Sequence, residues 1–384
     1  HIEFSDIFYE IISIANQYDG HNIIIGGDLN TYIGKRSRNA NILRQILDTE
    51  NLILLDEAPV YNASHFLGFF SVFNADAIKD IQFYKGAMPA NYGGRLSSVM
   101  DIRMKDGNAK KFAANAGIGL IASRLNLEGP IGDKASFMIS GRRTYADLFL
   151  RLSSDSTINQ NILYFYDLNA KVNVKINDNN RIFLSGYTGE DKFGQKNEFQ
   201  NSYGNQTFTF RWNHLFSQKL FSNLTVYTSN YKYNLSFQDA ETGLEWDSAL
   251  KDYGVKLDMG AYLSPRSTLK LGVQGILHKI EPGEIKGIGE NAIINAVTLN
   301  ASKALEGAAY IAHEYDLTNK LKISYGIRYS RHMNIGPDTT FNYNASYELL
   351  DTSYHNGNGI YNTYDNFEPR VGLRYNLNEN TSLK

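Results

Sequence analysis

Strict alternation of apolar and polar side chains, repeated in several segments, is the feature that most constrains the fold of this 384-residue chain. In the segment DLNAKVNVKIN (167–177), apolar side chains occupy every second position from Leu168 to Ile176, and polar side chains occupy the positions between them. The same period of two recurs at 206–213, 253–263 and 319–332. Successive side chains of a β-strand point to opposite faces, so each segment predicts a strand with one apolar face. Each pattern lasts about ten residues, which is the length of a tilted strand that crosses a bilayer.

The connections between these segments alternate in length. Tight turns are predicted at 177–180, 264–267, 317–320 and 376–380. Long polar loops are predicted at 190–204, 238–250, 281–300 and 333–366. Short turns at one rim and long loops at the other are typical of an outer-membrane β-barrel. A large soluble β-sandwich or a solenoid is the alternative.

Composition agrees with an all-β membrane protein and excludes several other classes. Aromatic residues reach 13%, with 26 Tyr and 21 Phe, as expected where aromatic girdles flank an apolar belt. No apolar run approaches 18 residues, which excludes a transmembrane helix. The absence of cysteine excludes disulfides, thiolate metal sites and a cysteine nucleophile. The net charge of −2 gives no general reason to expect nucleic-acid binding.

Catalytic and metal-binding motifs are also missing. The sequence contains no GxSxG, GxxxxGK[ST], HExxH or EF-hand loop, and its eight histidines have no metal-ligand spacing. We therefore expect no cofactor, no metal site and no enzymatic activity.

A glycine-rich turn precedes the alternating segments, and its surroundings resemble a known family. The stretch FYKGAMPANYGGRLSSVMDI (83–102) lies within 54–108, which carries D-x-A-P-V-Y-N and I-K-D-I-x-x-Y-K-G-x-x-P-A-x-Y-G-G-R-L-S-S-V. These motifs, with L-E-G-P-I at 127–131, resemble TonB-dependent outer-membrane receptors of the Bacteroidota type, and the resemblance extends from about residue 54 to the end. Residues 56–110 resemble the C-terminal half of the plug domain, and residues 111–384 resemble the N-terminal part of the barrel.

The resemblance implies that a small α/β plug sits inside the barrel and that its last strand leads into the first barrel strand. Gly93 and Gly94 would allow positive φ or close backbone approach at this exit. Together with Tyr92 and Arg95 they are expected to form a plug–barrel contact, with Arg95 paired to carboxylates of the inner barrel face. The alternative is a plain tight turn with a solvated Arg95.

A second set of candidate residues lies in a predicted apical loop of the plug. By resemblance, Tyr61, Asn62, His65 and Phe66 are expected to face the ligand, although a structural role is the alternative. The implied function is uptake of a scarce solute across the outer membrane, driven by TonB and accompanied by contact with outer-membrane lipid. The solute itself is unknown from the sequence, and no nucleic acid is expected.

The first 55 residues have a different texture, with a helical pattern and the strand-like NIIIGGDLN (22–30). They resemble a fragment of the endonuclease/exonuclease/phosphatase family, in particular retroelement nucleases, in which Asp28 and Asn30 would match a G-D-x-N motif beside Mg²⁺. An ordinary strand-to-loop turn is the alternative. The rest of that family's metal site has no counterpart here, so we expect no nuclease activity.

Taken together, the sequence predicts a mainly all-β fold: a partial transmembrane antiparallel β-barrel with a partial α/β plug, preceded by a short α/β fragment. The expected regions are 1–55, 56–110 and 111–384. The third region is predicted to contain about twelve strands, whereas the closed barrels of plugged outer-membrane transporters have about 22 strands. We therefore expect this chain by itself not to transport. The resemblance implies a TonB-contacting segment and the first half of the plug before residue 56, and residues 1–55 stand in their place, so we expect these residues to reflect a gene fusion or an assembly artefact. The chain shows no signal peptide.

Overall fold

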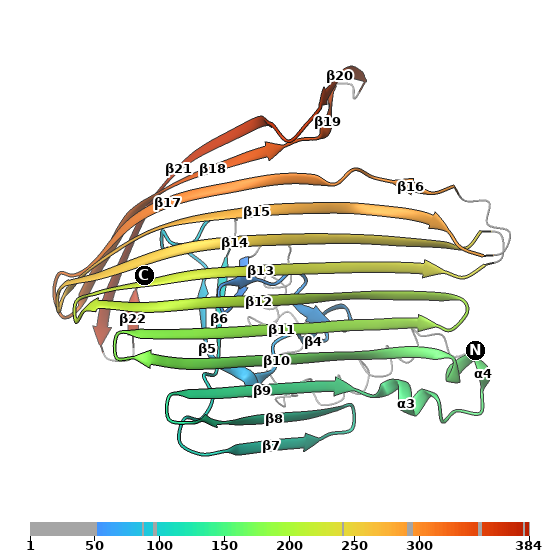
Figure 1. The fold of residues 1–384 in the computed structure, drawn as a ribbon, viewed down its shortest axis with the longest axis horizontal. Helices are drawn as coiled ribbons and strands as arrows, with labels where there is room; N and C mark the ends of the chain where they lie inside the picture. The colour runs from blue at the N-terminus through green and yellow to red at the C-terminus, as the bar shows by residue number, and fades with distance from the viewer. Residues whose placement is uncertain are drawn as a thin grey trace.

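The computed structural model describes residues 52–86, 88–94, 98–239, 242–289, 295–344, 348–378 and 381–383. A long curved sheet, here called the wall, wraps around a smaller group of strands, here called the inner unit and comprising residues 52–108 (Figure 1). Asp28 and Asn30, and the predicted α/β fragment around them, lie outside the described residues, as does Arg95. None of the helices in the described ranges is long and apolar enough to cross a membrane.

The wall is one antiparallel sheet of 14 strands. Its path runs β22–β21–β18–β17–β15–β14–β13–β12–β11–β10–β9–β8–β7, and β16 pairs with β15 outside this path. The first strands are β7 (Ala113–Ile118), β8 (Ala122–Ile131), β9 (Ala135–Thr144), β10 (Asn161–Asn177), β11 (Asn180–Gln195), β12 (Phe199–Ser217) and β13 (Leu220–Phe237). The later strands are β14 (Leu244–Ser264), β15 (Ser267–Gly287), β16 (Val297–Thr298), β17 (Ser302–Asp316), β18 (Leu321–Ile335), β21 (Ile360–Asn378) and β22 (Thr381–Leu383). The end strands β7 and β22 do not pair with each other among the described residues, so the barrel is not closed there.

Short helices and strands lie in the long connections at one rim of the wall. Two helices, α3 (Ala146–Leu150) and α4 (Ser156–Asn159), connect β9 to β10, and the Asp155 side chain caps α4 by accepting from the backbone N–H of Thr157. A hairpin of β19 (Asp338–Tyr343) and β20 (Leu349–His355) connects β18 to β21 on the same rim (Figure 1).

The predicted alternation is confirmed, but the predicted long loops are partly wrong. The tight turns lie where they were expected, whereas β11 continues to Gln195 and β12 resumes at Phe199, so the expected loop at 190–204 is mostly strand. Strands β14 and β15 are each 21 residues long and likewise take in much of 238–250 and 281–300. The physical reason is that these extensions are mostly polar and rich in glycine, and their few large apolar residues, such as Phe193, Trp246 and Ile285, do not form a continuous apolar face. Without an apolar face the two-residue signal disappears from the sequence, although the strand continues.

The inner unit is built on a four-stranded sheet in the order β2–β1–β6–β5. It comprises β1 (Leu52–Leu55), β2 (Ala58–Pro59), β5 (Ile78–Tyr84) and β6 (Val99–Met104), with β1 parallel to β6. A small pair of strands, β3 (Ser64–His65) and β4 (Phe70–Ser71), flanks the 3₁₀ turn η1 (Phe66–Gly68). Residues 75–77 form a single 3₁₀ turn, η2 (Ala75–Ala77), after which the chain enters β5.

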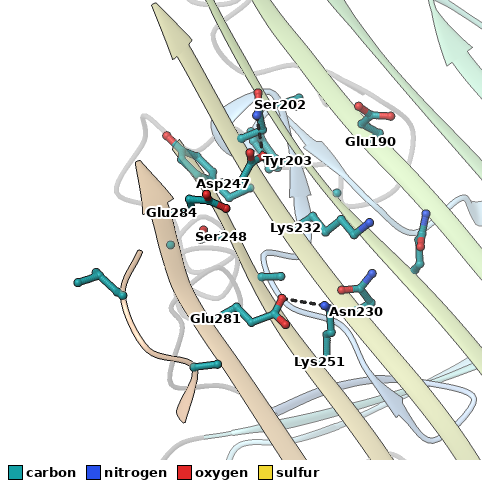
Figure 2. A pocket seen from close by; sticks show the side chains of 18 of the residues that line it. Glu190, Ser202, Tyr203, Asn230, Lys232, Asp247, Ser248, Lys251, Glu281 and Glu284 are labelled. Carbon is teal, nitrogen blue, oxygen red and sulfur yellow. Dashed lines mark hydrogen bonds and ion pairs between the residues drawn. The ribbon is translucent and has the colours of Figure 1, made fainter. Parts of the chain in front are cut away.

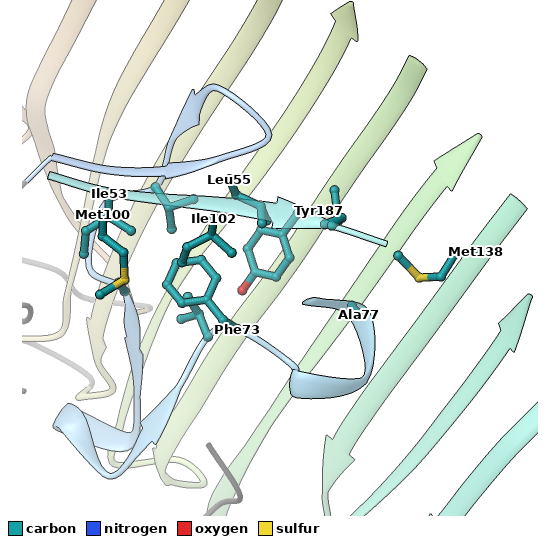
Figure 3. Packing of buried hydrophobic residues seen from close by; sticks show 12 residues of the cluster. Ile53, Leu55, Phe73, Ala77, Met100, Ile102, Met138 and Tyr187 are labelled. Atoms are coloured by element: carbon teal, nitrogen blue, oxygen red, sulfur yellow. The ribbon is translucent and has the colours of Figure 1, made fainter. Parts of the chain in front are cut away.

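The apolar core lies inside the inner unit and reaches the wall (Figure 3). Leu55, Ala77 and Ile102 are fully buried at its centre. Met138 of β9 and Tyr187 of β11 join this cluster from the wall. The inner unit is therefore anchored to one side of the wall by apolar packing.

The wall has opposite polarities on its two faces. In β10, Phe165, Asp167 and Lys171 are buried toward the inner unit, whereas Leu168 between them is 44% exposed on the other face. Large apolar side chains of the neighbouring strands, such as Phe208 and Val273, are exposed on that same outer face. An apolar outer face and a polar inner face are what a bilayer-spanning barrel requires.

Candidate functional site

The candidate site is the interface between the inner unit and the wall, together with the cavity beside it. The two parts form separate sheets and meet through side chains. The buried charged side chains that the wall contributes are Arg142, Asp167, Lys171, Asp191, Asp252, Lys256, Glu306 and Arg328. Charges buried this deeply require partners, and the inner unit supplies many of them.

His65 forms the centre of the first contact. Its ring is 1% exposed and stacks on Phe165, with 4.0 Å between ring centroids. Its Nδ1 lies 2.5 Å from Asp191 and its Nε2 lies 3.6 Å from Asp167. Burial lowers the pKa of His65, but the two carboxylates outweigh burial and raise that pKa above its ordinary value. The site therefore favours a positively charged ring between two wall carboxylates.

The same carboxylates bind the backbone around His65. Asp191 also accepts a hydrogen bond of 2.8 Å from the backbone N–H of Phe66. Asp167 accepts one of 2.8 Å from Nε of Arg142, whose Nη2 donates to the carbonyl of Ser71 at 2.7 Å. Strands β3 and β4 are thus attached to β9, β10 and β11 by one continuous network of hydrogen bonds and ion pairs.

Tyr61 and Asn62 contact the wall further along. The Tyr61 hydroxyl donates to Asp252 of β14 at 2.5 Å, and its backbone N–H donates to the Asn205 side chain at 3.0 Å. Asn62 has a φ of +46° and its Nδ2 lies 3.5 Å from the hydroxyl of Tyr231. The loop before β3 therefore docks on β12, β13 and β14.

The tight turn after β1 makes two further ion pairs. Asp56 and Glu57 have φ values of +46° and +79°. Nζ of Lys171 lies 3.0 Å from Asp56, and Nζ of Lys256 lies 3.2 Å from Glu57. Burial alone would raise the pKa of Glu57, but the charges of Arg103 and Lys256 outweigh it and hold the pKa well below its ordinary value. Glu57 is therefore a carboxylate in this site.

The glycine turn lies against the wall. A Cβ atom at Gly93 would lie 2.2 Å from Nε of Arg328 in β18, so a larger residue there would have to displace the Arg328 side chain. Gly94 has a φ of +76°, and a Cβ atom there would lie 3.1 Å from the carboxylate oxygens of Glu306. The Arg328 guanidinium is 1% exposed and lies 3.7 Å from Glu306.

Tyr92 lies beside this turn and is 6% exposed. Its hydroxyl donates to Asp101 at 2.8 Å, within the inner unit. Its ring lies 5.7 Å from Nζ of Lys256, which belongs to the wall. Burial, reinforced by the Asp101 charge, raises the pKa of Tyr92 far above its ordinary value, so the hydroxyl stays protonated.

The structure thus brings most of the sequence-predicted residues to one interface. A ligand-facing role for Tyr61, Asn62, His65 and Phe66 stays a prediction, since the contacts of Tyr61, His65 and the Phe66 backbone are with wall residues. Sequence reasoning missed their wall partners. A signal was present for Asp167, Lys171 and Lys256, which are charged residues on the polar face of alternating strands, whereas Asp191 lies in a segment predicted to be a loop.

A cavity of about 1090 Å³ lies between the inner unit and the wall near the tight-turn rim. It is lined by residues of β5 and its following turn and by β15, β17, β18 and β21. The cationic residues of the lining are Lys85, Lys270, Lys322, Arg370 and Arg374, against the single carboxylate of Glu314. Among the described residues, no group of three or more histidine or acidic side chains is placed to hold a metal ion.

Comparisons with known proteins agree with this architecture. Residues 133–384 match a family model described as "TonB dependent receptor-like, beta-barrel". A search of curated proteins finds no match. Among solved structures, the copper transporter OprC is similar with a TM-score of 0.62 and 10% identity, over 88% of this chain and 54% of OprC.

Two further solved structures show the same likeness. The FrpB iron transporter from Neisseria meningitidis (F3-3 variant) has a TM-score of 0.58 and 12% identity, over 87% of this chain and 56% of that chain. The alcaligin outer membrane receptor FauA from Bordetella pertussis has a TM-score of 0.60 and 13% identity, over 85% and 52%. At these identities the likeness shows the fold, and the chain spans little more than half the length of the three structures.

Proposed function

This chain belongs to the TonB-dependent receptor family, whose barrel it matches over residues 133–384, and from this premise we propose that it is part of a receptor for energy-coupled uptake of a scarce solute across the outer membrane and does not transport by itself. In this proposal the inner unit is the C-terminal half of the plug, corresponding to 56–110, and the wall is the N-terminal part of the barrel, corresponding to 111–384. The family and its solved relatives are receptors and transporters rather than enzymes.

The observation that carries the proposal is the way the inner unit is held. Side-chain ion pairs and hydrogen bonds attach it to the polar face of the wall, while the apolar face of the wall points outward. A unit attached in this way can shift without breaking a β-ladder, and such a shift would open a route through the lumen. The partners of this mechanism are outer-membrane lipid, the TonB energy-coupling complex and a small solute.

Metal complexes are the solutes to test first. The solved relatives are named as a copper transporter, an iron transporter and an alcaligin receptor. In the cavity beside β5, five cationic residues face one carboxylate, which favours an anionic complex over a cationic one.

The test is an uptake experiment in a Gram-negative strain that lacks its own metal-chelate receptors. Two proteins, each directed to the outer membrane by an export signal, would be supplied with radiolabelled iron chelates and copper, with and without functional TonB: a complete receptor that contains residues 52–384, and this chain by itself. We expect accumulation that requires both the complete receptor and TonB, and none from this chain by itself, whose wall is not closed among the described residues. Equal accumulation with and without TonB, in cells whose membranes contain the folded receptor, would overturn the proposal.

The alternative function, Mg²⁺-dependent DNA cleavage through Asp28 and Asn30, concerns residues outside the described ranges and stays a prediction of the sequence. Cleavage of plasmid DNA that requires Mg²⁺ and disappears in Asp28→Ala would establish it.

A further inference from the structure

A second cavity, of about 800 Å³, is lined by residues of the wall strands β10 to β16 (Figure 2). Its lining includes Tyr166, Glu190, Lys232 and Lys251. Tyr166, Glu190 and Lys251 are the sequence neighbours of Asp167, Asp191 and Asp252, which are buried toward the inner unit. Lys232 lies in the same register row as Glu190 and therefore on the same face of the sheet. Because side chains alternate along a strand, this lining faces outward.

The position of the cavity relative to the apolar outer face is fixed by strand register. Tyr253, Leu277 and Leu305 are register partners on β14, β15 and β17, and the first two are 51% and 38% exposed to the outside. The next outward-facing row toward the long-connection rim is Lys251, Lys279 and Lys303, which are again register partners. The apolar belt therefore ends against a row of three lysines.

Like charges placed directly opposite one another in a sheet are destabilising. A single carboxylate, Glu281, pairs with this row, at 2.7 Å from Nζ of Lys251 (Figure 2). The same carboxylate lies 2.5 Å from Nζ of Lys279, which does not line the cavity itself. Lys303 has a side-chain amide, that of Asn358, at 3.5 Å. The row has more positive charge than its protein partners neutralise, which points to an anionic ligand at the edge of the apolar belt.

The lysine row continues on the neighbouring strands as Asn230 of β13 and Gln206 of β12, which are register partners of Lys251 and of each other. The next outward-facing row contains the Tyr166–Glu190 pair, joined by a hydrogen bond of 2.8 Å, so the cavity presents amide, hydroxyl and carboxylate groups beside the lysines. Lys232 makes no ion pair with any described residue, and Asp247 and Glu284 lie still nearer the strand ends. Amides and carboxylates of this kind hydrogen-bond the hydroxyls of sugars.

We propose that this outward cavity binds the phosphorylated sugar headgroup of an outer-leaflet glycolipid. The phosphate lies against Lys251, Lys279 and Lys303 where the apolar belt ends, and the sugar ring lies in the cavity beyond. The acyl chains continue along Tyr253, Leu277 and Leu305. The site rests on the proposed membrane placement of the wall, but it lies on the other face from the solute cavity and is independent of which solute is carried.

The test uses the chain reconstituted in phosphatidylcholine nanodiscs with and without bis-phosphorylated lipid A, with bound lipid counted by native mass spectrometry. We expect lipid A to be retained above the phosphatidylcholine background. The triple variant Lys251→Gln, Lys279→Gln, Lys303→Gln should reduce the affinity about a hundredfold, because each lysine near a charged membrane surface contributes on the order of a factor of five. The control variant, Lys175→Gln, Lys219→Gln, Lys320→Gln, removes the same charge at the tight-turn rim and should keep the affinity.

Each contrary outcome has a distinct meaning. Equal retention by the triple variant, equal retention of dephosphorylated lipid A, or full competition by millimolar inorganic phosphate would overturn the glycolipid site. Insertion of each variant is measured separately, by protection of the wall from added protease. A wild-type chain that fails to insert would overturn the proposed function together with this site, whereas insertion without lipid A enrichment would overturn this site alone.

Discussion

The inner unit and the wall place their apolar side chains on opposite sides. In the inner unit Ile53, Leu55 and Ile102 point inward and are buried, as in a water-soluble domain. In the wall Leu168, Val226 and Val273 point outward, at 44%, 44% and 53% exposure, and the polar side chains point inward. The two parts therefore meet mainly through polar side chains. The inner unit buries its apolar side chains as a protein in water does, whereas the wall exposes its apolar side chains as a protein in a lipid bilayer does.

This difference determines how much the contact between the inner unit and the wall contributes to the free energy of folding. Desolvating two charges costs nearly as much as their attraction returns, so a buried ion pair contributes little net stability. Removing one partner is expensive, because the other charge stays buried and unpaired. The contact is therefore specific in register without being a strong bond, and it is sensitive to single substitutions.

The largest effect should come from breaking one buried ion pair. Lys171→Met leaves Asp56 without the ammonium at 3.0 Å and also removes the Lys171 bond to the carbonyl of Met104. We expect the attachment of the inner unit to weaken by about 3–5 kcal/mol. The sequence has no cysteine, so a single reporter in Ala77→Cys, at a position that is 0% exposed, would measure opening by its rate of thiol labelling.

The matched control is Lys175, which lies four residues further along the same strand and on the same face. Lys175 pairs with Asp178 at the tight turn, where the two side chains are 49% and 91% exposed. Lys175→Met should leave the labelling rate unchanged, because exposed pairs contribute little. Equal effects of the two substitutions would show that burial does not distinguish the two positions as we describe.

The second effect concerns the segment that joins the two parts. Gly107 has a φ of +79°, and a Cβ atom there would lie 2.2 Å from the carbonyl oxygen of Phe137 in β9. Gly107→Ala should cost about 1–3 kcal/mol from backbone strain, with the clash adding to it. Gly132→Ala is the control, since its φ is +58° with nothing within 4 Å. A Gly107→Ala variant no less stable than Gly132→Ala in urea titrations would contradict the close approach.

The third effect is a pH dependence of the same attachment. The pKa of His65 is raised in the folded protein, so its contribution is fully present below the unfolded value of about 6.5 and is lost as pH rises through the folded pKa. The charged groups that face it are Asp167, Asp191 and, through Asp167, Arg142. Above pH of about 6.5 we expect the free energy of unfolding to fall by up to about 1.4 kcal/mol per pH unit.

The variant His65→Gln isolates this term, because glutamine does not titrate. Its unfolding, followed by reporter labelling between weakly acidic and weakly alkaline pH, should lack the wild-type slope. A slope that persists in His65→Gln would assign the pH dependence to another group.

The smallest effect concerns the loop before β3. Tyr61→Phe removes the hydroxyl that donates to Asp252, but Asp252 keeps His278 at 2.8 Å. We expect a loss of about 1 kcal/mol, the usual net value of one hydrogen bond. Hydrogen exchange of the backbone amides of 58–66 would measure it, and an effect as large as that of Lys171→Met would show that the docking of this loop is more critical than the ion pairs.

Sequence alone predicted the wall because burial there is periodic: residues 168–176 show which face is apolar without any alignment. It also predicted a close approach at the Gly93–Gly94 turn, since few other residues tolerate it. It could not predict that Lys171 pairs with Asp56, because the two are far apart in the chain and their contact depends on how the inner unit docks. The row of Lys251, Lys279 and Lys303 was equally hidden, because it appears only when the register of three strands is known.

The separateness of the two sheets has a mechanical consequence. Among the described residues, every hydrogen bond from the wall to the inner unit uses at least one side chain, and no backbone ladder crosses between them. The attachments at Asp56, Tyr61, His65 and Gly93 follow one another along the chain, in the turn after β1, the loop before β3, β3 itself and the glycine turn before β6, so a pulling force applied at one end would load them one after another. Such a contact yields by peeling at low force, whereas the long ladders of the wall share a load along their strands and keep their shape.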